Sequence, residues 1–293
     1  MEKIIHTWWP VSILLVVVVV GALFVINTDQ ENYLAAVHIL DIGQGDAILV
    51  ELPDEQRWLI DGGPDDSVVA ELQQVLPFGE RQLTGLILTH PHNDHVAGLN
   101  SVLELFSVKY VVMAASVHTS PSYINFLETL KNKKIEVIAI DEPVVWQNES
   151  DEWTWEFVYP QVGAMMDTNL NNQSIVSRLV VGEQQFLFTG DAEVEVEKLL
   201  VGQGIDLSAT VLKVGHHGSD TSTSQLLLDA VNPDYAVISL AANNSFGHPH
   251  MSVIDRLKSM GAQILRTDEH GTISLYTDGV NLNIDAERAV VAY

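Results

Sequence analysis

The 293-residue sequence contains no cysteine. Disulfide bonds, thiolate metal ligands, a cysteine nucleophile and a lipid-modified cysteine are therefore excluded, and no disulfide-linked partner is expected. Basic residues are also scarce, since 14 Lys and Arg face 39 Asp and Glu, for a formal net charge of −25. This balance argues against a protein that holds nucleic-acid backbone on a basic face, although bound metal ions can supply positive charge locally.

Apolar material, by contrast, is abundant. Hydrophobic residues make up 47 % of the chain and charged residues 18 %, which excludes a disordered polyelectrolyte and provides for a substantial core. The sequence has no Pro/Gly-rich linker and no short-period repeat beyond residue 35. We therefore expect a short linker over residues 28–35 and one domain over residues 36–293.

The amino-terminal segment is long and apolar. No Asp, Glu, Lys or Arg occurs between Lys3 and Asp29. As a helix, residues 8–26 would be about 28 Å long, roughly the thickness of a bilayer's hydrocarbon core. A cleaved signal peptide is the alternative, but the apolar run exceeds a usual signal core. We predict a membrane anchor over residues 1–27, and Lys3 before the span places the rest outside the cytoplasm, in the periplasm or at the cell exterior.

From residue 36 onward, short apolar runs rich in β-branched residues alternate with turn residues, which predicts many strands. Strands followed by helices occur once in each half of this region. This order predicts two sheets packed face to face with helices outside. The helices are expected over residues 67–75, 123–134, 192–200, 222–230 and 251–260.

The most specific motif is HPHNDH at residues 90–95, directly after an apolar strand-like run. Its imidazoles and carboxylate are not residues that pack a core. Each neutral imidazole offers a lone pair to a metal ion, and a loop at the end of a strand can direct alternate side chains at two neighbouring ions. The motif therefore predicts a metal site.

Three further motifs contain candidate ligands or catalytic groups. Asp191 ends the run FLFTGD, His216 and His217 follow a strand in KVGHHGS, and His248 and His250 lie in FGHPH. None of these is specific alone, because Gly-Asp turns and histidine pairs are common.

Taken together and in this order, the motifs resemble a known family. HPHNDH is similar to the H-x-H-x-D-H signature of the metallo-β-lactamase superfamily. The elements LDIGQGD, HHGS and GHPH resemble the extracytoplasmic metallo-hydrolase domain of ComEC-type competence proteins, the DNA-uptake family. The resemblance runs from residue 37 to residue 276 and implies an α/β fold, the four-layer αββα sandwich, here with one N-terminal transmembrane helix.

The resemblance also implies a centre of two divalent metal ions. Lactamase-type members carry a further histidine where this sequence has Asn171 and Asn172. The first site is then richer in oxygen and suits manganese or magnesium as well as zinc. The implied ligands are His90 and His92 for the first ion, Asp94, His95 and either His217 or His216 for the second, and Asp191 between the two.

Several residues are candidates for catalytic or orienting roles. Asp94 is also expected to be essential for catalysis. Lys213 either holds a substrate phosphate or, as the favoured alternative, faces solvent from its strand. His248 is a candidate general acid that supports the leaving oxygen. Asp61 either orients a metal ligand or only forms the turn before two glycines.

We therefore predict a membrane-anchored, extracytoplasmic, metal-dependent hydrolase of phosphodiesterase or nuclease type, in which water activated by two metal ions attacks phosphorus. The expected partners are the membrane, through the N-terminal helix, and DNA or another phosphodiester as substrate. Hydrolysis of a non-nucleic ester, a lactone or a β-lactam-like amide by the same site is the alternative. A third reading is a non-catalytic binding protein, against which the intact ligand set argues.

Overall fold

The structure, a computed structural model, describes residues 33–163 and 168–288. The predicted anchor over residues 1–27 and most of the predicted linker lie outside these residues. Ala35, which the sequence assigns to the linker, already begins the first strand. Within the described part of the chain, no helix combines the length and the apolar composition that a membrane span requires.

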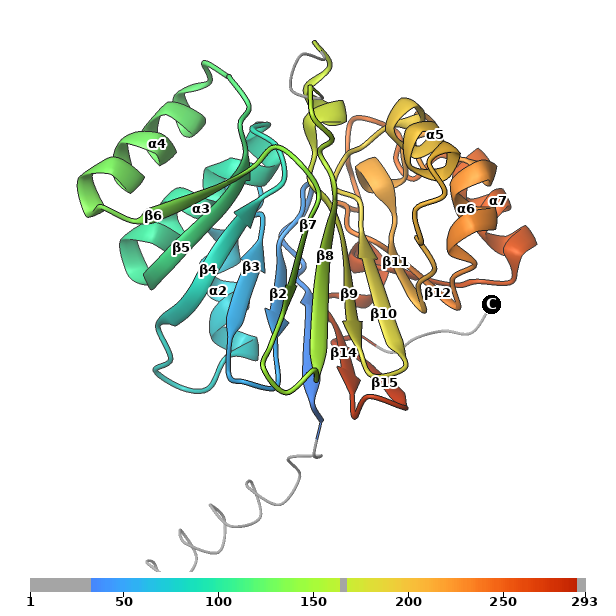
Figure 1. Cartoon of the computed structure of the whole chain (residues 1–293), viewed down its shortest axis with the longest axis horizontal. Helices are drawn as coiled ribbons and strands as arrows, with labels where there is room; N and C mark the ends of the chain where they lie inside the picture. The colour runs from blue at the N-terminus through green and yellow to red at the C-terminus, as the bar shows by residue number, and fades with distance from the viewer. Residues whose placement is uncertain (1–32, 164–167, 289–293) are drawn as a thin grey trace, which may run out of the picture. The chain divides into compact units, whose positions relative to one another are not determined.

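The first sheet has eight strands in the order β15-β14-β1-β2-β3-β4-β5-β6 (Figure 1). From β3 to β6 neighbouring strands run parallel, and from β15 to β3 they run antiparallel. The strands are β1 (Ala35–Ile39), β2 (Ile48–Glu51), β3 (Arg57–Ile60), β4 (Gln82–Leu88), β5 (Ser107–Ala114), β6 (Glu136–Ile140), β14 (Ile273–Thr277) and β15 (Leu282–Ala286).

The second sheet has seven strands in the order β13-β12-β11-β10-β9-β8-β7. Strands β10 to β13 run parallel, whereas β7 to β10 form an antiparallel meander. The strands are β7 (Val144–Gln147), β8 (Trp153–Tyr159), β9 (Val176–Val181), β10 (Gln184–Phe188), β11 (Val211–Lys213), β12 (Tyr235–Ile238) and β13 (Gln263–Arg266).

Helices cover the outer face of each sheet (Figure 1). The first sheet carries α2 (Ser67–Val75), α3 (Asn93–Leu105) and α4 (Pro121–Lys133), and the second carries α5 (Val194–Gly202), α6 (Gln225–Val231) and α7 (Met251–Met260). Short helical turns are η2 (Leu170–Gln173), η3 (Gly215–Gly218) and α8 (Thr267–His270). The predicted αββα sandwich of two sheets is thereby confirmed.

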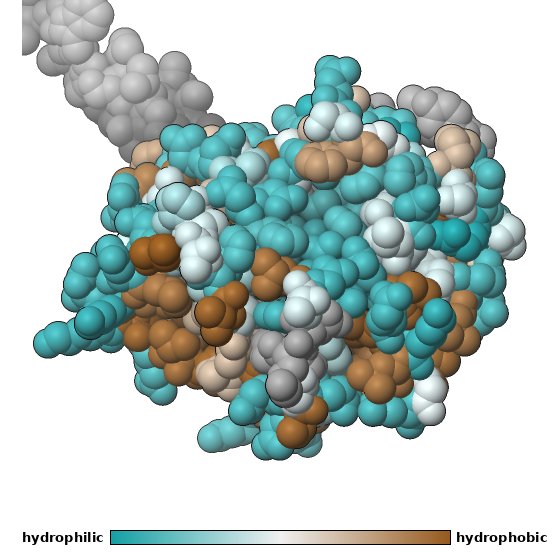
Figure 2. Space-filling view, turned by 90° about the horizontal axis from the view of Figure 1, so that it is seen from above, coloured by the Kyte–Doolittle hydropathy of each residue, from teal (hydrophilic) through white to brown (hydrophobic). Residues whose placement is uncertain are grey.

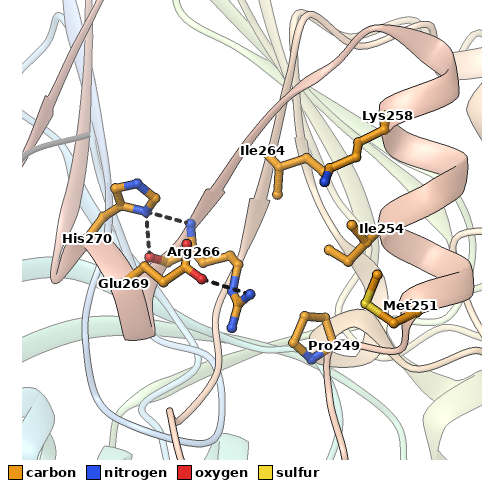
Figure 3. Close-up of a pocket in the computed structure, with 8 residues that line it drawn as sticks. All are labelled: Pro249, Met251, Ile254, Lys258, Ile264, Arg266, Glu269 and His270. Atoms are coloured by element: carbon orange, nitrogen blue, oxygen red, sulfur yellow. Dashed lines mark hydrogen bonds and ion pairs between the residues drawn. The ribbon is translucent and has the colours of Figure 1, made fainter. Parts of the chain in front are cut away.

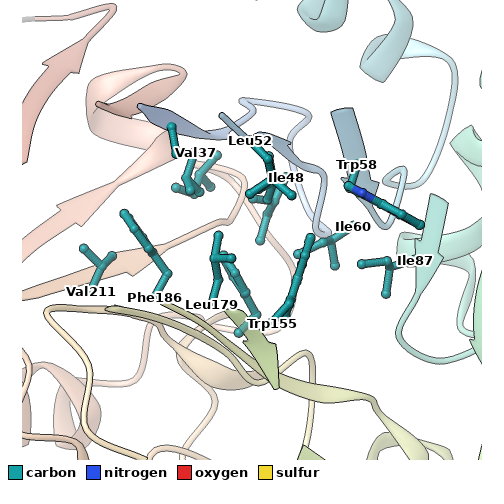
Figure 4. Close-up of a cluster of buried hydrophobic side chains, with 14 of the residues drawn as sticks. Val37, Ile48, Leu52, Trp58, Ile60, Ile87, Trp155, Leu179, Phe186 and Val211 are labelled. Atoms are coloured by element: carbon teal, nitrogen blue, oxygen red, sulfur yellow. The ribbon is translucent and has the colours of Figure 1, made fainter. Parts of the chain in front are cut away.

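Three apolar cores hold the four layers together. The central core lies between the sheets, where side chains from both inner faces point toward one another (Figure 4). Trp155 and Phe186 from the second sheet meet Ile48 and Ile60 from the first, and all four are fully buried. Each of the two outer cores lies between one sheet and the helices that cover it. Burial of apolar area on both faces explains why the central strands read as continuous apolar runs.

The helix predictions were accurate where local signals are strong. Helices α2 and α7 begin and end at the predicted residues. The helix predicted from residue 222 begins only at Gln225, because the Ser224 side chain is the cap that accepts the amide hydrogen of Leu227. Helix α3 was not predicted. It begins at Asn93, inside the HPHNDH motif, so the second half of that motif is a helical turn and not a loop.

Candidate metal centre

The predicted ligands gather at one edge of the sandwich, where β4, β10 and β11 end. His90 follows β4, Asp191 follows β10 and His217 follows β11. The carboxyl ends of parallel strands are the usual place for sites in open α/β sheets. Figure 2 looks down on the sandwich from above and shows hydrophilic residues across the middle of this face, with hydrophobic patches to the left and right.

Four of the predicted ligands form a compact group, here called the Asp/His cluster: Asp94, His95, Asp191 and His217. One ligand atom from each lies within 4.8 Å of all the others. His95 Nε2 is 3.3 Å from Asp191 Oδ2, and His217 Nε2 is 3.6 Å from Asp94 Oδ2 and from Asp191 Oδ1. The structure thus brings together predicted ligands that are up to 123 positions apart in the chain (217 − 94).

The cluster has unpaired nitrogen and oxygen atoms that could bind a divalent ion. His95 Nε2, His217 Nε2 and Asp191 Oδ1 are buried and make no hydrogen bond with the described residues. Buried polar atoms are almost always paired, so three orphans aimed at one point indicate a missing ligand. Imidazole nitrogen and carboxylate oxygen together suit zinc or manganese. The residues present therefore fit a metal ion.

Asp191 is the centre of the site. Its Oδ2 lies 3.3 Å from His95 Nε2, 3.7 Å from His90 Nε2 and 3.8 Å from His216 Nε2. His92 stands behind His90, with a hydrogen bond of 3.0 Å between His90 Nε2 and His92 Nδ1. His90 thus lies beside the cluster at the same carboxylate, and His92 is joined to the site through His90.

The charges of the cluster stabilise one another against burial. Burial alone would lower the pKa of His217, but Asp191 and Asp46 raise it to about 9. Burial would raise the pKa of Asp191, but His95 and His217 hold it well below its usual range. Without an ion, protonated His95 and His217 supply the positive charge that balances the carboxylates of the cluster. An ion bound here would displace those protons.

Two histidines follow β11, and the structure distinguishes them. His217 is buried, and its Nδ1 donates a hydrogen bond of 2.9 Å to the carbonyl of Ser239, which leaves Nε2 directed at the cluster. His216 lies at the edge, with 23 % of its side chain exposed. Both residues have left-handed backbone conformations, with φ of 48° and 54°. Such residues cost of order 1–3 kcal/mol each and persist where the surroundings impose them.

Asp61 orients His95, a predicted ligand, as one of the two interpretations of the sequence expected. Its Oδ2 accepts a hydrogen bond of 2.8 Å from His95 Nδ1, and its two oxygens also accept from the amide and the hydroxyl of Thr89. This fixes the imidazole so that Nε2 faces the cluster. Burial raises the pKa of Asp61, and the charge of His95 opposes that rise.

Lys213 is not exposed, so the favoured expectation that it faces solvent is wrong. The side chain is 2 % exposed, and its Nζ donates to Asp46 Oδ2 at 2.8 Å and to the carbonyl of Val214. Asp46 Oδ1 in turn lies 3.5 Å from His217 Nδ1. Burial works to raise the pKa of Asp46, yet Lys213 and His217 lower it to about 2. Lys213 therefore acts on the cluster through Asp46 and does not point at a substrate.

Two acids have orienting roles that sequence reasoning did not assign. Asp46 lies in the turn before β2. The sequence shows it in the GQGD motif but does not indicate which side chain it contacts. Glu193 directly precedes α5, where an acid is common at a helix N-terminus, but its side chain does not cap α5. Its Oε1 instead accepts hydrogen bonds from Asn171 and Thr221 and lies 3.5 Å from His216 Nδ1. The signal in the sequence that could have indicated this role is the position of Glu193, two residues after the predicted ligand Asp191.

The two asparagines that stand where a histidine was expected differ in their contacts. Asn172 Oδ1 accepts a hydrogen bond from the amide of Glu193. Asn171 Nδ2 donates to Glu193 Oε1, and Asn171 Oδ1 is buried without a hydrogen bond to the described residues. Of the two, Asn171 is the one with a free oxygen.

The GHPH segment contributes the outer edge of the site. The ring of His248 lies 5.7 Å from that of His216 and 5.2 Å from that of His250. Burial and the neighbouring imidazole of His216 lower the pKa of His248 to about 4, so it is neutral at pH 7. Its role as general acid stays a prediction. His250 Nδ1 accepts a hydrogen bond from the amide of Asp220, which is a structural role.

A cavity of about 290 Å³ lies elsewhere, between α7 and β13 (Figure 3). Met251, Ile254 and Ile264 make its wall apolar, and Arg266, which also lines it, forms an ion pair of 2.9 Å with Glu269. Among the described residues that line it, none belongs to the Asp/His cluster. The cavity is therefore separate from the candidate metal centre.

Gly45 gives a direct test of the packing beneath the cluster. Its φ is +135°, and a Cβ built there would lie 2.2 Å from the carbonyl oxygen of Asp94. We expect Gly45→Ala to displace Asp94 and weaken ion binding about tenfold or more, because a ligand moves. Isothermal titration with Mn²⁺ measures this. Gly43→Ala is the control, since Gly43 also has a positive φ but no atom within 4 Å of its Cβ. Equal losses in both variants would contradict the prediction.

Comparison with known proteins agrees with this geometry. The family model of the metallo-beta-lactamase superfamily matches residues 40–242, which include the Asp/His cluster. The chain belongs to the metallo-β-lactamase superfamily. The resemblance drawn from the motifs is thus confirmed, and the chain is a metallo-hydrolase of this superfamily with a cluster suited to binding metal.

One relative of this superfamily member is a ComE operon protein, and another is a competence protein. ComE operon protein 3 of Bacillus subtilis (strain 168) is 31 % identical over 254 residues, which cover 81 % of this chain and 32 % of the relative. Competence protein ComA of Neisseria gonorrhoeae is 31 % identical over 249 residues, or 82 % of this chain and 32 % of the relative. The chain therefore spans about a third of the length of these relatives.

The metallo-β-lactamase fold is also found in a solved structure of a long form RNase Z from yeast. That structure matches with a TM-score of 0.54 at 12 % identity, over 84 % of this chain and 42 % of the other. At this identity the likeness shows the common fold.

Proposed function

We propose that this metallo-hydrolase cleaves phosphodiester bonds with nuclease-type chemistry, using two divalent ions. The observation that carries the proposal is the position of Asp191, which has His90 Nε2 at 3.7 Å as well as His95 and His217 at 3.3 and 3.6 Å. A carboxylate among so many imidazoles suits a ligand shared by two ions. Two ions, when bound, stabilise charge on the attacking and leaving oxygens of an in-line displacement.

The chain's own residues hold this arrangement. Asp94 lies in the first turn of α3, where the helix N-terminus favours a negative charge. We propose that Asn171 Oδ1, which is buried and free, supplies the oxygen ligand on the side of His90 and His92. An amide oxygen in place of an imidazole favours a harder ion, so we expect Mn²⁺ to support activity at least as well as Zn²⁺.

We further propose that the hydrolase works outside the cytoplasm, anchored by the apolar segment of residues 1–27. DNA is the proposed natural phosphodiester, because the ComE operon protein and the competence protein are similar over four-fifths of this chain. DNA uptake is not part of the proposal.

The test compares three substrates on the full chain loaded with Mn²⁺ or Zn²⁺. We expect hydrolysis of single-stranded DNA and of bis(p-nitrophenyl) phosphate, and no hydrolysis of a β-lactam. Asp94→Ala is the inactive control, because it removes a carboxylate from the cluster. Phosphodiester cleavage that survives Asp94→Ala, or that is absent with both metals, would refute the proposal.

A further inference from the structure

An exposed aromatic residue stands beside the candidate metal centre. Phe246 lies in the loop between β12 and α7 and is 61 % exposed. Its ring stacks on the imidazole of His248, with 5.7 Å between centroids and 25° between planes. Stacking covers one face of the Phe246 ring, and the exposed fraction leaves room for another flat group.

The loop that presents Phe246 is held in place by one side chain. Asn244 Oδ1 accepts hydrogen bonds from the amides of Phe246 at 3.2 Å and His248 at 2.9 Å. Its Nδ2 donates to the carbonyls of Ala241 at 2.9 Å and His248 at 2.7 Å. A preorganised backbone loses little entropy when a ligand binds. The exposed ring is therefore a fixed platform and not a mobile side chain on a loose loop.

Phe246 is connected to the candidate metal centre through two histidine rings. The ring of His248 is 5.7 Å from that of His216, and His216 Nε2 is 3.8 Å from Asp191 Oδ2. The rings of His216 and His248 thus connect Asp191 to Phe246, and a nucleotide strand bound at Asp191 can extend along them. The two basic side chains on neighbouring segments are already committed, Lys213 to Asp46 and Arg256 to the carbonyls of Ser222 and Thr223.

We propose that Phe246 is the platform on which a nucleobase adjacent to the scissile phosphodiester stacks. This inference rests on the proposed phosphodiesterase function and names its substrate class, a single-stranded nucleic acid with an unpaired base beside the cleaved bond. Stacking needs no positive charge and accepts any base, which suits a chain of net charge −25. A paired base in a duplex does not expose its face to the ring.

The test measures binding, so that it does not depend on turnover. A fluorescent single-stranded oligonucleotide with phosphorothioate linkages is titrated with the full chain and Mn²⁺, and its dissociation constant is followed by anisotropy. The same oligonucleotide with abasic sites is titrated in parallel. The variants are Phe246→Ala, Phe246→Trp and, as matched control, Phe78→Ala, because Phe78 is fully exposed in the loop between α2 and β4.

We expect the wild type to bind the base-bearing oligonucleotide about tenfold to 100-fold more tightly than the abasic one. Phe246→Ala should remove that difference, and Phe246→Trp and Phe78→Ala should keep it. Equal binding of both oligonucleotides by the wild type, or a difference that Phe246→Ala leaves intact, overturns the inference. Absence of phosphodiester hydrolysis in the substrate assay described above refutes the proposed function instead, and the binding result still decides the role of Phe246.

Discussion

Asp191→Asn is expected to lower kcat/KM for phosphodiester hydrolysis about 1000-fold or more. Asp191 is the carboxylate that touches the imidazoles of His90, His95 and His217, and its neutral replacement removes the charge that holds a dication there. The loss corresponds to the several kcal/mol that ion-mediated charge stabilisation contributes to such transition states. Activity assays and the manganese content after dialysis measure the effect.

The control for this variant is Asp255→Asn, which makes the same chemical change on the exposed face of α7. It should retain both activity and ion content. An Asp191→Asn protein that binds as much manganese as the wild type would show that the ions lie elsewhere. A variant that binds fewer ions but turns over normally would show that only one ion is needed.

Lys213→Met is the second variant for which a large effect is expected. It removes the positive partner of Asp46 and leaves a carboxylate buried, since both side chains are 2 % exposed. Removing one partner of a buried ion pair typically costs about 3–5 kcal/mol, so the free energy of unfolding should fall by that amount. Urea unfolding of the metal-free protein measures it. Lys198→Met, on the exposed face of α5, should change it by no more than about 0.5 kcal/mol.

The double variant Asp46→Asn with Lys213→Met separates stability from orientation. It removes both charges, so most of the lost stability should return. Ion binding should remain weaker than in the wild type, because Asp46 no longer faces His217 Nδ1 at 3.5 Å. Full recovery of ion affinity in the double variant would show that the pair only fills space.

The residues of the site that were predictable from the sequence are those in short local motifs. His90, Asp191 and His217 each follow a strand, and a strand that ends beside its parallel neighbours brings such residues to one edge. The sandwich was predictable for the same reason, because strands and helices recur in the same order in both halves. What these signals share is that each depends on a few neighbouring residues.

Partners that lie outside the recognised motifs and far away in sequence were not predictable. Lys213 ends a three-residue strand that is buried along its length, so it had to face inward, but its partner Asp46 is 167 residues away. A single sequence gives no sign of such a pairing. Glu193 was similarly ambiguous, since an acid before a helix is common for reasons unrelated to a site. The start of α3 was missed because the motif was interpreted only as a set of ligands.

The strand order also has a consequence for how the chain is made. Strand β1 pairs with β14, and His38 Nδ1 meets Ser274 Oγ at 2.8 Å across 236 positions. Val37 and Ile39, which belong to the central core, lie opposite Leu275 and Ile273. During synthesis, the second neighbour of β1 therefore does not exist until about 236 further residues have been added. Contacts between residues so far apart in sequence form slowly. Until then the edge of β1 is open to pairing with other chains, so pairing with β14 protects the newly made protein from aggregation.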